Sequence, residues 1–384
     1  MGLFDMDALV VGAGLTGGVI ARELAEQGCK VLVWDRREHI GGNMYDYVDE
    51  HGILVHKYGP HTFHTKERAL YEYVCRFGEW QDYKLTCGAM IKGEFTPTPF
   101  NFHTIDTFYE ENEATALKAE LKDYFSGREF ATVLEVLNAG NERIRKYGEF
   151  LFAHDYSLYT AKQWGIAPGK VDPSILKRVP LRFSYKEGYF DNEYQMMPRN
   201  TYVEWFKNLL DHSDIHVELG VEALEHLSVS EEKLLMDGAA CKIPVVYTGA
   251  LDELFGQSEG SLPYRSLRFE WCHEDIESKQ PYPVTAYPEA EAYTRITEYK
   301  KMPVQNVTGT TYVVEYPLMY KPGAGIEPYY PVLTAESQRK AAIYKSMSEK
   351  ISNLYPCGRL ADFKYYNMDQ ALARALVVAR EVIV

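Results

Sequence analysis

The chain has 384 residues, of which 46% are hydrophobic and 25% charged, and its formal net charge is −14. This length fits two or three packed domains, and the composition is that of a soluble globular protein. The negative charge argues against binding to nucleic acid or to an anionic membrane. No stretch approaches the ~20 apolar residues that span a bilayer, so we expect no membrane partner.

The six cysteines are scattered along the chain, and no two of them form a C-x-x-C pair. In a chain of this length, such cysteines are more typical of a reduced protein than of disulfide bonds or a metal site. The N-terminus lacks the basic segment of a secretion signal. We therefore expect a cytoplasmic protein without a bound metal.

Residues 1–35 show the pattern of a strand, a tight turn, a helix and a second strand. An apolar run at 8–11 precedes a glycine-rich turn, then helical periodicity over 19–27 and another apolar run at 30–34. Asp35 ends the second strand. This is the βαβ arrangement of a Rossmann-like fold.

The middle of the chain contains a helical region and two strand-rich regions. Charged, glycine-poor sequence over 105–145 predicts a helical insertion. The segments 179–197 and 262–314 are short, alternating and rich in tyrosine and threonine, which predicts antiparallel strands.

Further elements are expected to return to the first sheet. The pattern predicts a helix over 202–210 and strands at 215–219 and 245–249, and we expect both strands to rejoin the parallel sheet. A last helix is expected to start at Asn367, with Gln370 where a capping-box partner belongs.

The glycine-rich turn carries a nucleotide-binding pattern. Gly12, Gly14 and Gly17 form G-x-G-x-x-G, in which the first glycine permits the turn, the second lets the backbone approach a pyrophosphate and the third lets helix and strand pack. The helix N-terminus then faces the negative charge. Asp35 suits a ribose 2′-hydroxyl, which favours FAD or NAD over NADP. The alternative interpretation is a purely structural turn.

A second glycine pair favours FAD over NAD. His39-Ile40-Gly41-Gly42-Asn43 follows shortly after Asp35. Flavoproteins of the amine-oxidase type carry such a pair where bare backbone approaches the cofactor. The alternative interpretation is a plain loop.

Over nearly its full length the chain resembles the bacterial UDP-galactopyranose mutase family. Besides the first fingerprint, the resemblance is carried by a series of blocks in the family's order: Ile40-Gly41-Gly42-Asn43, Tyr58-Gly59-Pro60-His61, Phe63-His64-Thr65, Tyr159-Thr160-Ala161-Lys162-Gln163-Trp164, Arg178-Val179-Pro180-Leu181-Arg182-Phe183, Gly188-Tyr189-Phe190, Val245-Val246-Tyr247-Thr248-Gly249, Tyr293-Thr294-Arg295-Ile296, Glu327-Pro328-Tyr329-Tyr330-Pro331, Gly358-Arg359-Leu360 and Tyr365-Tyr366-Asn367-Met368-Asp369.

The resemblance implies interconversion of UDP-galactopyranose and UDP-galactofuranose, for galactofuranose-containing glycans of the cell wall, with no net redox change. In this family N5 of reduced FAD forms a covalent flavin–sugar adduct, so the cofactor carries the covalent chemistry. The resemblance also implies a homodimer.

The resemblance assigns roles to residues that match the family's blocks. Arg178 and Arg295 are the expected catalytic residues, as bidentate donors to the diphosphate whose charge grows when UDP departs. The expected substrate-binding residues are Tyr156, Tyr159, Trp164, Tyr189, Tyr329 and Tyr365. Those expected to bind FAD are Gly12, Gly14, Thr16, Gly17, Asp35, Arg36, Gly42, Asn43, His61, Arg359, Asn367 and Met368.

The resemblance also implies a mixed α/β fold with three parts. Residues 1–83, 200–256 and 330–384 form a Rossmann-like FAD-binding domain with a parallel sheet. Residues 104–178 form a helical domain with a mobile substrate loop. Residues 84–103, 179–199 and 257–329 form an antiparallel-sheet domain.

Three positions depart from the family pattern. Asp155 stands where relatives are often aromatic, Asn367 where aspartate is more frequent and Ala361 where glycine is more frequent. Two other functions remain open from the residues: an amine-oxidase-type FAD oxidoreductase, and a non-catalytic nucleotide-sugar binder. The first offers no reason for the paired arginines or for Trp164.

Overall fold

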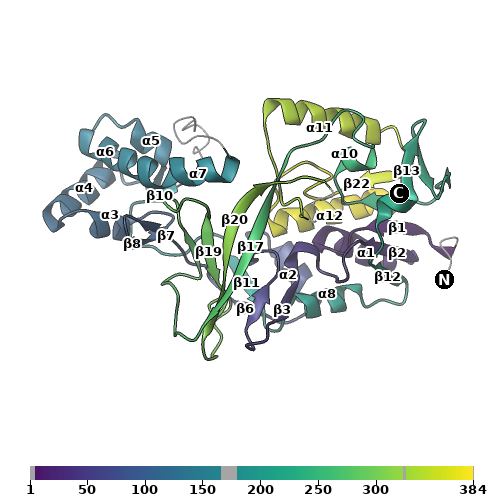
Figure 1. The fold of residues 1–384 in the computed structure, drawn as a ribbon, viewed down its shortest axis with the longest axis horizontal. Coiled ribbons are helices and arrows are strands. Elements are labelled where there is room, and N and C mark those ends of the chain that lie inside the picture. The colour runs from purple at the N-terminus through teal and green to yellow at the C-terminus, as the bar shows by residue number, and fades with distance from the viewer. Residues whose placement is uncertain (1–4, 166–179, 323–325, 384) are drawn as a thin grey trace.

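The computed structural model describes residues 5–165, 180–322 and 326–383. Figure 1 shows an elongated molecule, with the helices of residues 102–164 at one end and the sheet that contains the first strand at the other. Two long strands run between these ends. The mixed α/β class predicted from the sequence is confirmed.

The first sheet has five parallel strands in the order β12-β2-β1-β16-β22. Their bounds are Ala8–Val11 for β1, Val31–Asp35 for β2, Ile215–Leu219 for β12, Val245–Tyr247 for β16 and Leu354–Pro356 for β22. β12 pairs with β2 and β16 with β1, both in parallel, which confirms that 215–219 and 245–249 rejoin this sheet.

Helices cover both faces of the parallel sheet. On one face α1 (Leu15–Glu26), α8 (Tyr202–Leu210) and α12 (Met368–Ile383) share a buried core with the strands. On the other face α10 (Leu251–Leu254) and α11 (Ala335–Ser348) do the same. Covering on both faces explains why these strands are nearly continuous apolar runs.

A second sheet has seven strands in the order β21-β17-β20-β19-β18-β7-β8. The bounds are Cys87–Ile91 for β7, Glu94–Thr98 for β8, Tyr264–Glu274 for β17, Val284–Ala286 for β18, Arg295–Glu298 for β19, Thr310–Met319 for β20 and Tyr330–Pro331 for β21. All pairs are antiparallel except β18 with β7. The strands predicted within 262–314 therefore form this sheet.

The strands predicted within 179–197 are antiparallel but pair outside the seven-stranded sheet. β10 (Pro180–Arg182) pairs with β9 (Phe130–Thr132), and β11 (Tyr194–Pro198) lies between β5 (Phe63–Thr65) and β6 (Trp80–Asp82). Met196 and Met197 of β11 are buried in the core that α1, α8 and α12 share with the parallel sheet. The division into three domains remains our proposal.

The helical region consists of α3 (Phe102–Phe108), α4 (Glu111–Tyr124), α5 (Val133–Leu137), α6 (Glu142–Leu151), a π-helical turn (Phe152–Tyr156) and α7 (Ser157–Trp164). Its core is apolar and includes Leu117, Leu121 and Leu151. Capping boxes at Asn101 and Thr132 start α3 and α5. The helical insertion predicted over 105–145 is thus confirmed.

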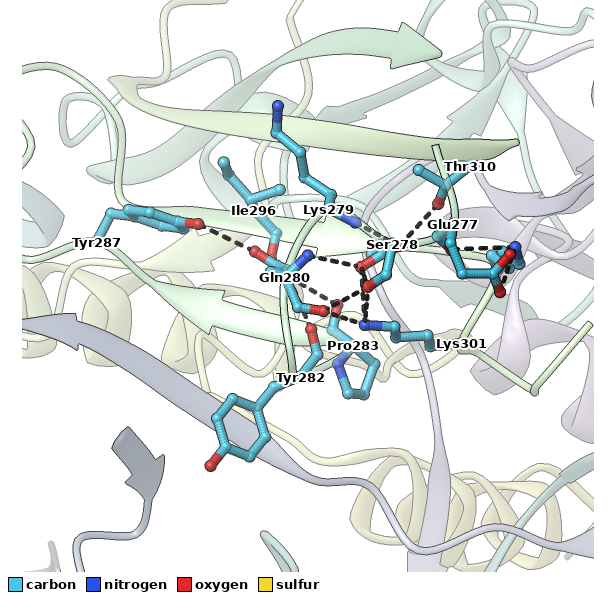
Figure 2. Close-up of polar contacts among 12 residues, drawn as sticks. Glu277, Ser278, Lys279, Gln280, Tyr282, Pro283, Tyr287, Ile296, Lys301 and Thr310 are labelled. Carbon is cyan, nitrogen blue, oxygen red and sulfur yellow. Dashed lines mark hydrogen bonds and ion pairs between the residues drawn. The ribbon is translucent and has the colours of Figure 1, made fainter. Parts of the chain in front are cut away.

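A buried polar network holds the segment between β17 and β18 (Figure 2). The carboxylate of Glu298, which is fully buried, accepts the backbone N–H groups of Lys279 at 3.0 Å and Gln280 at 3.2 Å. The side-chain amide of Gln280 donates to the carbonyl of Ile296 at 3.0 Å. These bonds fix β18, which forms part of a cavity wall.

Over residues 5–165, 180–322 and 326–383, no helix is long and apolar enough to cross a membrane. In the same ranges, no group of three or more His, Cys, Asp or Glu side chains is placed to hold a metal ion.

Candidate active site

The glycine-rich turn forms the floor of a cavity of about 260 Å³ at the carboxyl ends of β1 and β2. Gly12 has φ +109°, and a Cβ there would lie 2.1 Å from Oγ1 of Thr248. A Cβ at Gly17 would lie 1.9 Å from the carbonyl oxygen of Gly12. Both positions therefore require glycine for the fold itself.

Gly14 has a different role, because its Cβ would meet only the backbone of Gly42, at 3.5 Å. The helix α1 starts directly after Gly14 without a side-chain cap, so its first N–H groups face the cavity rather than a protein oxygen. Uncapped helix starts of this kind bind phosphate groups in other proteins. The second glycine pair lies against the first, which supports the interpretation that both face one cofactor.

Asp35 and two arginines form the cavity rim. The Asp35 carboxylate accepts the N–H of Ala13 at 2.7 Å and that of Arg37 at 2.9 Å, so it is held rigidly at the end of β2. Glu327 forms ion pairs with Arg36 at 2.5 Å and with Arg37 at 3.0 Å. These ion pairs connect the segment before β21 to the loop after β2 at the rim of the cavity.

A second cavity, of about 660 Å³, opens beside the first. Six side chains line both cavities: Asn43, His61, Tyr329, Arg359, Asn367 and Met368. The N-terminus of α12 therefore lies at the boundary between the two cavities.

Two of these boundary residues have fixed orientations. Arg359 donates to the carbonyls of Tyr329 at 3.3 Å and Tyr366 at 2.7 Å, and its guanidinium lies over the rings of Tyr330 and Tyr365. The Nδ1 of His61 lies 2.8 Å from the carbonyl of Gly59, which makes Nδ1 the donor and leaves a lone pair on Nε2. Burial lowers the pKa of His61 to about 4, so its imidazole is neutral at pH 7.

Arg295 is the cationic side chain on the β19 side of the second cavity. Its Nε donates to Glu315 on β20 at 2.6 Å, and Glu315 also accepts from the hydroxyl of Thr297. Burial opposes the charge of Arg295, but the carboxylate of Glu315 outweighs this and raises the arginine pKa well above its usual value. A permanently charged guanidinium with its Nε engaged suits an anionic ligand.

Tyrosines form much of the remaining wall. Tyr156, Tyr159, Tyr189, Tyr329 and Tyr365 all line the second cavity. Tyr189 and Tyr365 are 44% and 56% exposed. Tyr156 and Tyr329 are buried in the wall.

The helix α7 is anchored to the loop before Arg295. The ammonium of Lys162 donates to three carbonyls of that loop, those of Tyr287, Ala290 and Tyr293, at 2.6–2.8 Å. One turn earlier on the same helix, Tyr159 faces the cavity. The anchor thus couples the placement of Tyr159 to that of Arg295.

The structure brings most of the predicted residues to these two cavities. All twelve residues expected to bind the cofactor line the first one: Gly12, Gly14, Thr16, Gly17, Asp35, Arg36, Gly42, Asn43, His61, Arg359, Asn367 and Met368. Arg295 and five of the six predicted aromatic residues line the second. Arg178 and the side chain of Trp164 lie outside the part of the molecule that the structure describes. The roles of all these residues remain predictions.

Sequence reasoning missed two carboxylates. Glu315 interrupts an apolar run within 310–319, which was an available signal for a buried partner. Glu327 was part of a quoted block, but nothing local indicated that it would pair with Arg36, 291 residues earlier.

Comparison with known proteins agrees with this architecture. Residues 155–365 match the family described as UDP-galactopyranose mutase, and residues 10–77 match the NAD(P)-binding Rossmann-like domain. The UDP-galactopyranose mutase of Mycoplasma pneumoniae is 32% identical, over 98% of this chain and 96% of that protein. The dTDP-fucopyranose mutase of Escherichia coli is 34% identical, over 97% of each.

Solved structures share the fold at low sequence identity. A crystal structure of reduced UDP-galactopyranose mutase aligns with a TM-score of 0.70 at 13% identity, covering 98% of this chain and 95% of that one. A putrescine oxidase bound to putrescine aligns with a TM-score of 0.54, also at 13% identity, covering 98% and 99%.

The parallel sheet and its glycine turn define a protein of the Rossmann-like α/β class, and a tyrosine-lined cavity adjoins the turn. The near full-length match to curated relatives narrows this class further. The chain belongs to the UDP-galactopyranose mutase family, a family of isomerases.

Proposed function

We propose that the chain binds FAD in the first cavity and a UDP-sugar in the second, and that it interconverts UDP-galactopyranose and UDP-galactofuranose for galactofuranose-containing glycans. The observation that supports this most is the boundary of six residues shared by the two cavities. Such a boundary lets one end of a dinucleotide meet a ligand in the second cavity.

The residues present fit FAD. The uncapped start of α1 suits the pyrophosphate, and the carboxylate of Asp35 suits a ribose hydroxyl. The nucleophile in this proposal is N5 of reduced FAD, which supplies the covalent bond to the sugar.

The protein's own residues bind and orient the substrate. Arg295 donates to the diphosphate, and this bond strengthens as negative charge develops on the departing phosphate. Tyr189 and Tyr365 donate hydroxyl groups without adding charge. Arg178 is proposed as the second diphosphate arginine, and Trp164 as part of a loop that closes over the sugar.

The test is chromatography of UDP-galactofuranose incubated with the protein, with and without dithionite. We expect UDP-galactopyranose only after reduction. Absence of conversion under both conditions, with UDP still bound, would favour the non-catalytic binder.

A second substrate deserves a parallel assay, because a dTDP-fucopyranose mutase is as similar to the chain as the UDP-galactose enzymes are. Faster turnover of dTDP-fucopyranose than of UDP-galactopyranose would move the proposal to that substrate. An amine-oxidase-type oxidoreductase remains the third candidate, since a putrescine oxidase shares the fold. Oxygen consumption with an added amine would identify it.

We also propose that the protein is a cytoplasmic homodimer. Light scattering coupled to size-exclusion chromatography measures the oligomeric state directly.

A further inference from the structure

Arg182 lies four residues after the predicted catalytic arginine, at the end of β10, but it is not among the described residues that line the two cavities. Its side chain is 6% exposed, and a buried guanidinium needs acceptors for its donors. In the part of the chain that the structure describes, the side-chain acceptors of Arg182 are in the loop between β10 and β11. This loop carries Tyr189, which lines the second cavity.

The peptide unit between Gly188 and Tyr189 is held at both ends. Nη1 of Arg182 donates to the carbonyl of Gly188, and the N–H of Tyr189 donates to the carbonyl of Leu85 at 2.7 Å. Because a peptide unit is planar, these two bonds together prevent its plane from turning. The orientation of this plane sets the direction in which the side chain of Tyr189 leaves the backbone.

Arg182 also holds the chain on the far side of Tyr189. Its Nη2 donates to the carboxylate of Asp191 at 3.0 Å, so one guanidinium contacts the residue before the tyrosine and the second residue after it. The planar fork of an arginine presents both donors at a fixed angle, whereas the ammonium of a lysine is a compact charge on a flexible stem.

Tyr189 needs such support because its ring is only partly packed. The side chain is 44% exposed, and its ring meets Phe190 edge-on with centroids 4.9 Å apart. Phe190 in turn stacks on His64 at 3.6 Å. Contact on one side leaves the phenol free to move, and fixing it through the backbone lowers the entropy that a bound ligand must overcome.

We propose that Arg182 is a positioning residue for Tyr189, which fixes the Gly188–Tyr189 peptide so that the phenol hydroxyl is placed for the ligand in advance. This inference rests on the proposed function, because the ligand that the hydroxyl meets is the diphosphate of the nucleotide sugar. The two arginines of the block then have separate tasks. Arg178 is proposed to bind the diphosphate, and Arg182 holds a neutral donor for it.

A double-mutant cycle tests the coupling between the two residues. The measured quantity is the Kd of UDP with the FAD-loaded protein, by calorimetry. Tyr189→Phe should weaken UDP about tenfold, as loss of a hydrogen bond to a charged group implies. Arg182→Met keeps the side-chain volume but removes the donors, and should weaken UDP by a similar factor. In the Tyr189→Phe background the same change should cost less than about twofold, because no hydroxyl remains to be positioned.

Gly188→Ala tests the same peptide without removing a buried charge. The added Cβ would meet only the carbonyl oxygen of Phe190, at 3.9 Å, but φ at Gly188 is +102°, which alanine disfavours. The peptide should therefore turn, and UDP should be weakened in the wild-type background but not in Tyr189→Phe. This second cycle decides the proposal if Arg182→Met does not fold. Arg182→Lys should restore only part of the affinity.

The matched control is Arg128→Met. Arg128 lies next to β9, the strand that pairs with β10, and its exposed side chain pairs with Glu135 at 2.8 Å. Removing this pair should leave the Kd of UDP unchanged.

The outcomes separate the two proposals. Losses that multiply to about 100-fold when Arg182→Met or Gly188→Ala is combined with Tyr189→Phe overturn the positioning role, and so does an unchanged Kd in Tyr189→Phe. Isomerisation of the UDP-sugar can stand in both cases. A wild-type protein that does not bind UDP overturns this inference together with the proposed function.

Discussion

The Nε atom of Arg295 donates to Oε2 of Glu315 at 2.6 Å, and the Glu315 side chain is 1% exposed. The two residues are directly opposite each other on β19 and β20. Because one edge of the guanidinium is engaged by a buried carboxylate, its direction toward the cavity is set by the sheet rather than by the ligand. Such preorganisation is what makes a charged donor effective in a transition state.

Replacing Arg295 should therefore lower catalysis more than binding. Arg295→Ala is expected to reduce kcat at least ~100-fold, as loss of a charged transition-state donor typically does. Arg295→Lys keeps the charge but loses the planar fork, so it should recover only part of the rate. Steady-state kinetics with reduced enzyme provides the measurement.

A matched control is available in the same sheet, on the strand next but one to β19. Arg268 on β17 is exposed and pairs with Glu270 at 3.3 Å, so Arg268→Ala should leave kcat and KM near the wild-type values. Near wild-type rates in Arg295→Ala would contradict the diphosphate assignment.

Alanine substitutions in the glycine turn should have two different effects, loss of the cofactor at Gly14 and loss of folding at Gly17. Gly14→Ala adds a Cβ that makes only an ordinary contact within the protein, at 3.5 Å, so the apoprotein should keep its stability. If the proposed pyrophosphate lies against the glycine turn, the same Cβ would hinder its close approach, and we expect purified Gly14→Ala to lose its flavin absorbance.

In Gly17→Ala we expect folding, rather than cofactor binding alone, to be impaired. Its Cβ would lie 1.9 Å from the backbone oxygen of Gly12, so folding itself should be impaired, with low soluble yield even when FAD is supplied. Full flavin content in Gly14→Ala would contradict the cofactor site.

Four of the five strands of the parallel sheet were predictable from the sequence, because each is an apolar run bounded by turn residues. The fifth strand, β22, was not predicted, because its three residues are too short a run to stand out. The start of α1 was less well predicted. It begins at Leu15 rather than at residue 19, because Gly17 and Gly18 have no side chains from which helical periodicity could be read.

Long-range pairings could not be predicted in this way. β9 pairs with β10 across 48 or more residues, and Glu327 reaches Arg36 from the far end of the chain. These contacts depend on how distant elements pack together, and the local sequence around each partner does not indicate which residue it contacts. The site residues were predicted through the family blocks, whereas the pairing of Arg295 with Glu315 became visible only in three dimensions.

From the network in Figure 2 we predict that replacing two glutamates, Glu298 and Glu277, will lower the free energy of unfolding by very different amounts. Glu298 is fully buried, pairs with Lys301 at 3.0 Å and accepts from the hydroxyl of Thr310 at 2.9 Å. Glu298→Ala leaves these donors buried without an acceptor, so we expect a loss of about 3 kcal/mol or more in the free energy of unfolding.

The control for this prediction is Glu277→Ala. Its side chain is 95% exposed and pairs with Lys300 at 3.3 Å, so removal should change stability by less than about 0.5 kcal/mol. Urea denaturation of both variants gives the comparison, and equal midpoints would show that the buried carboxylate does not hold the segment before β18.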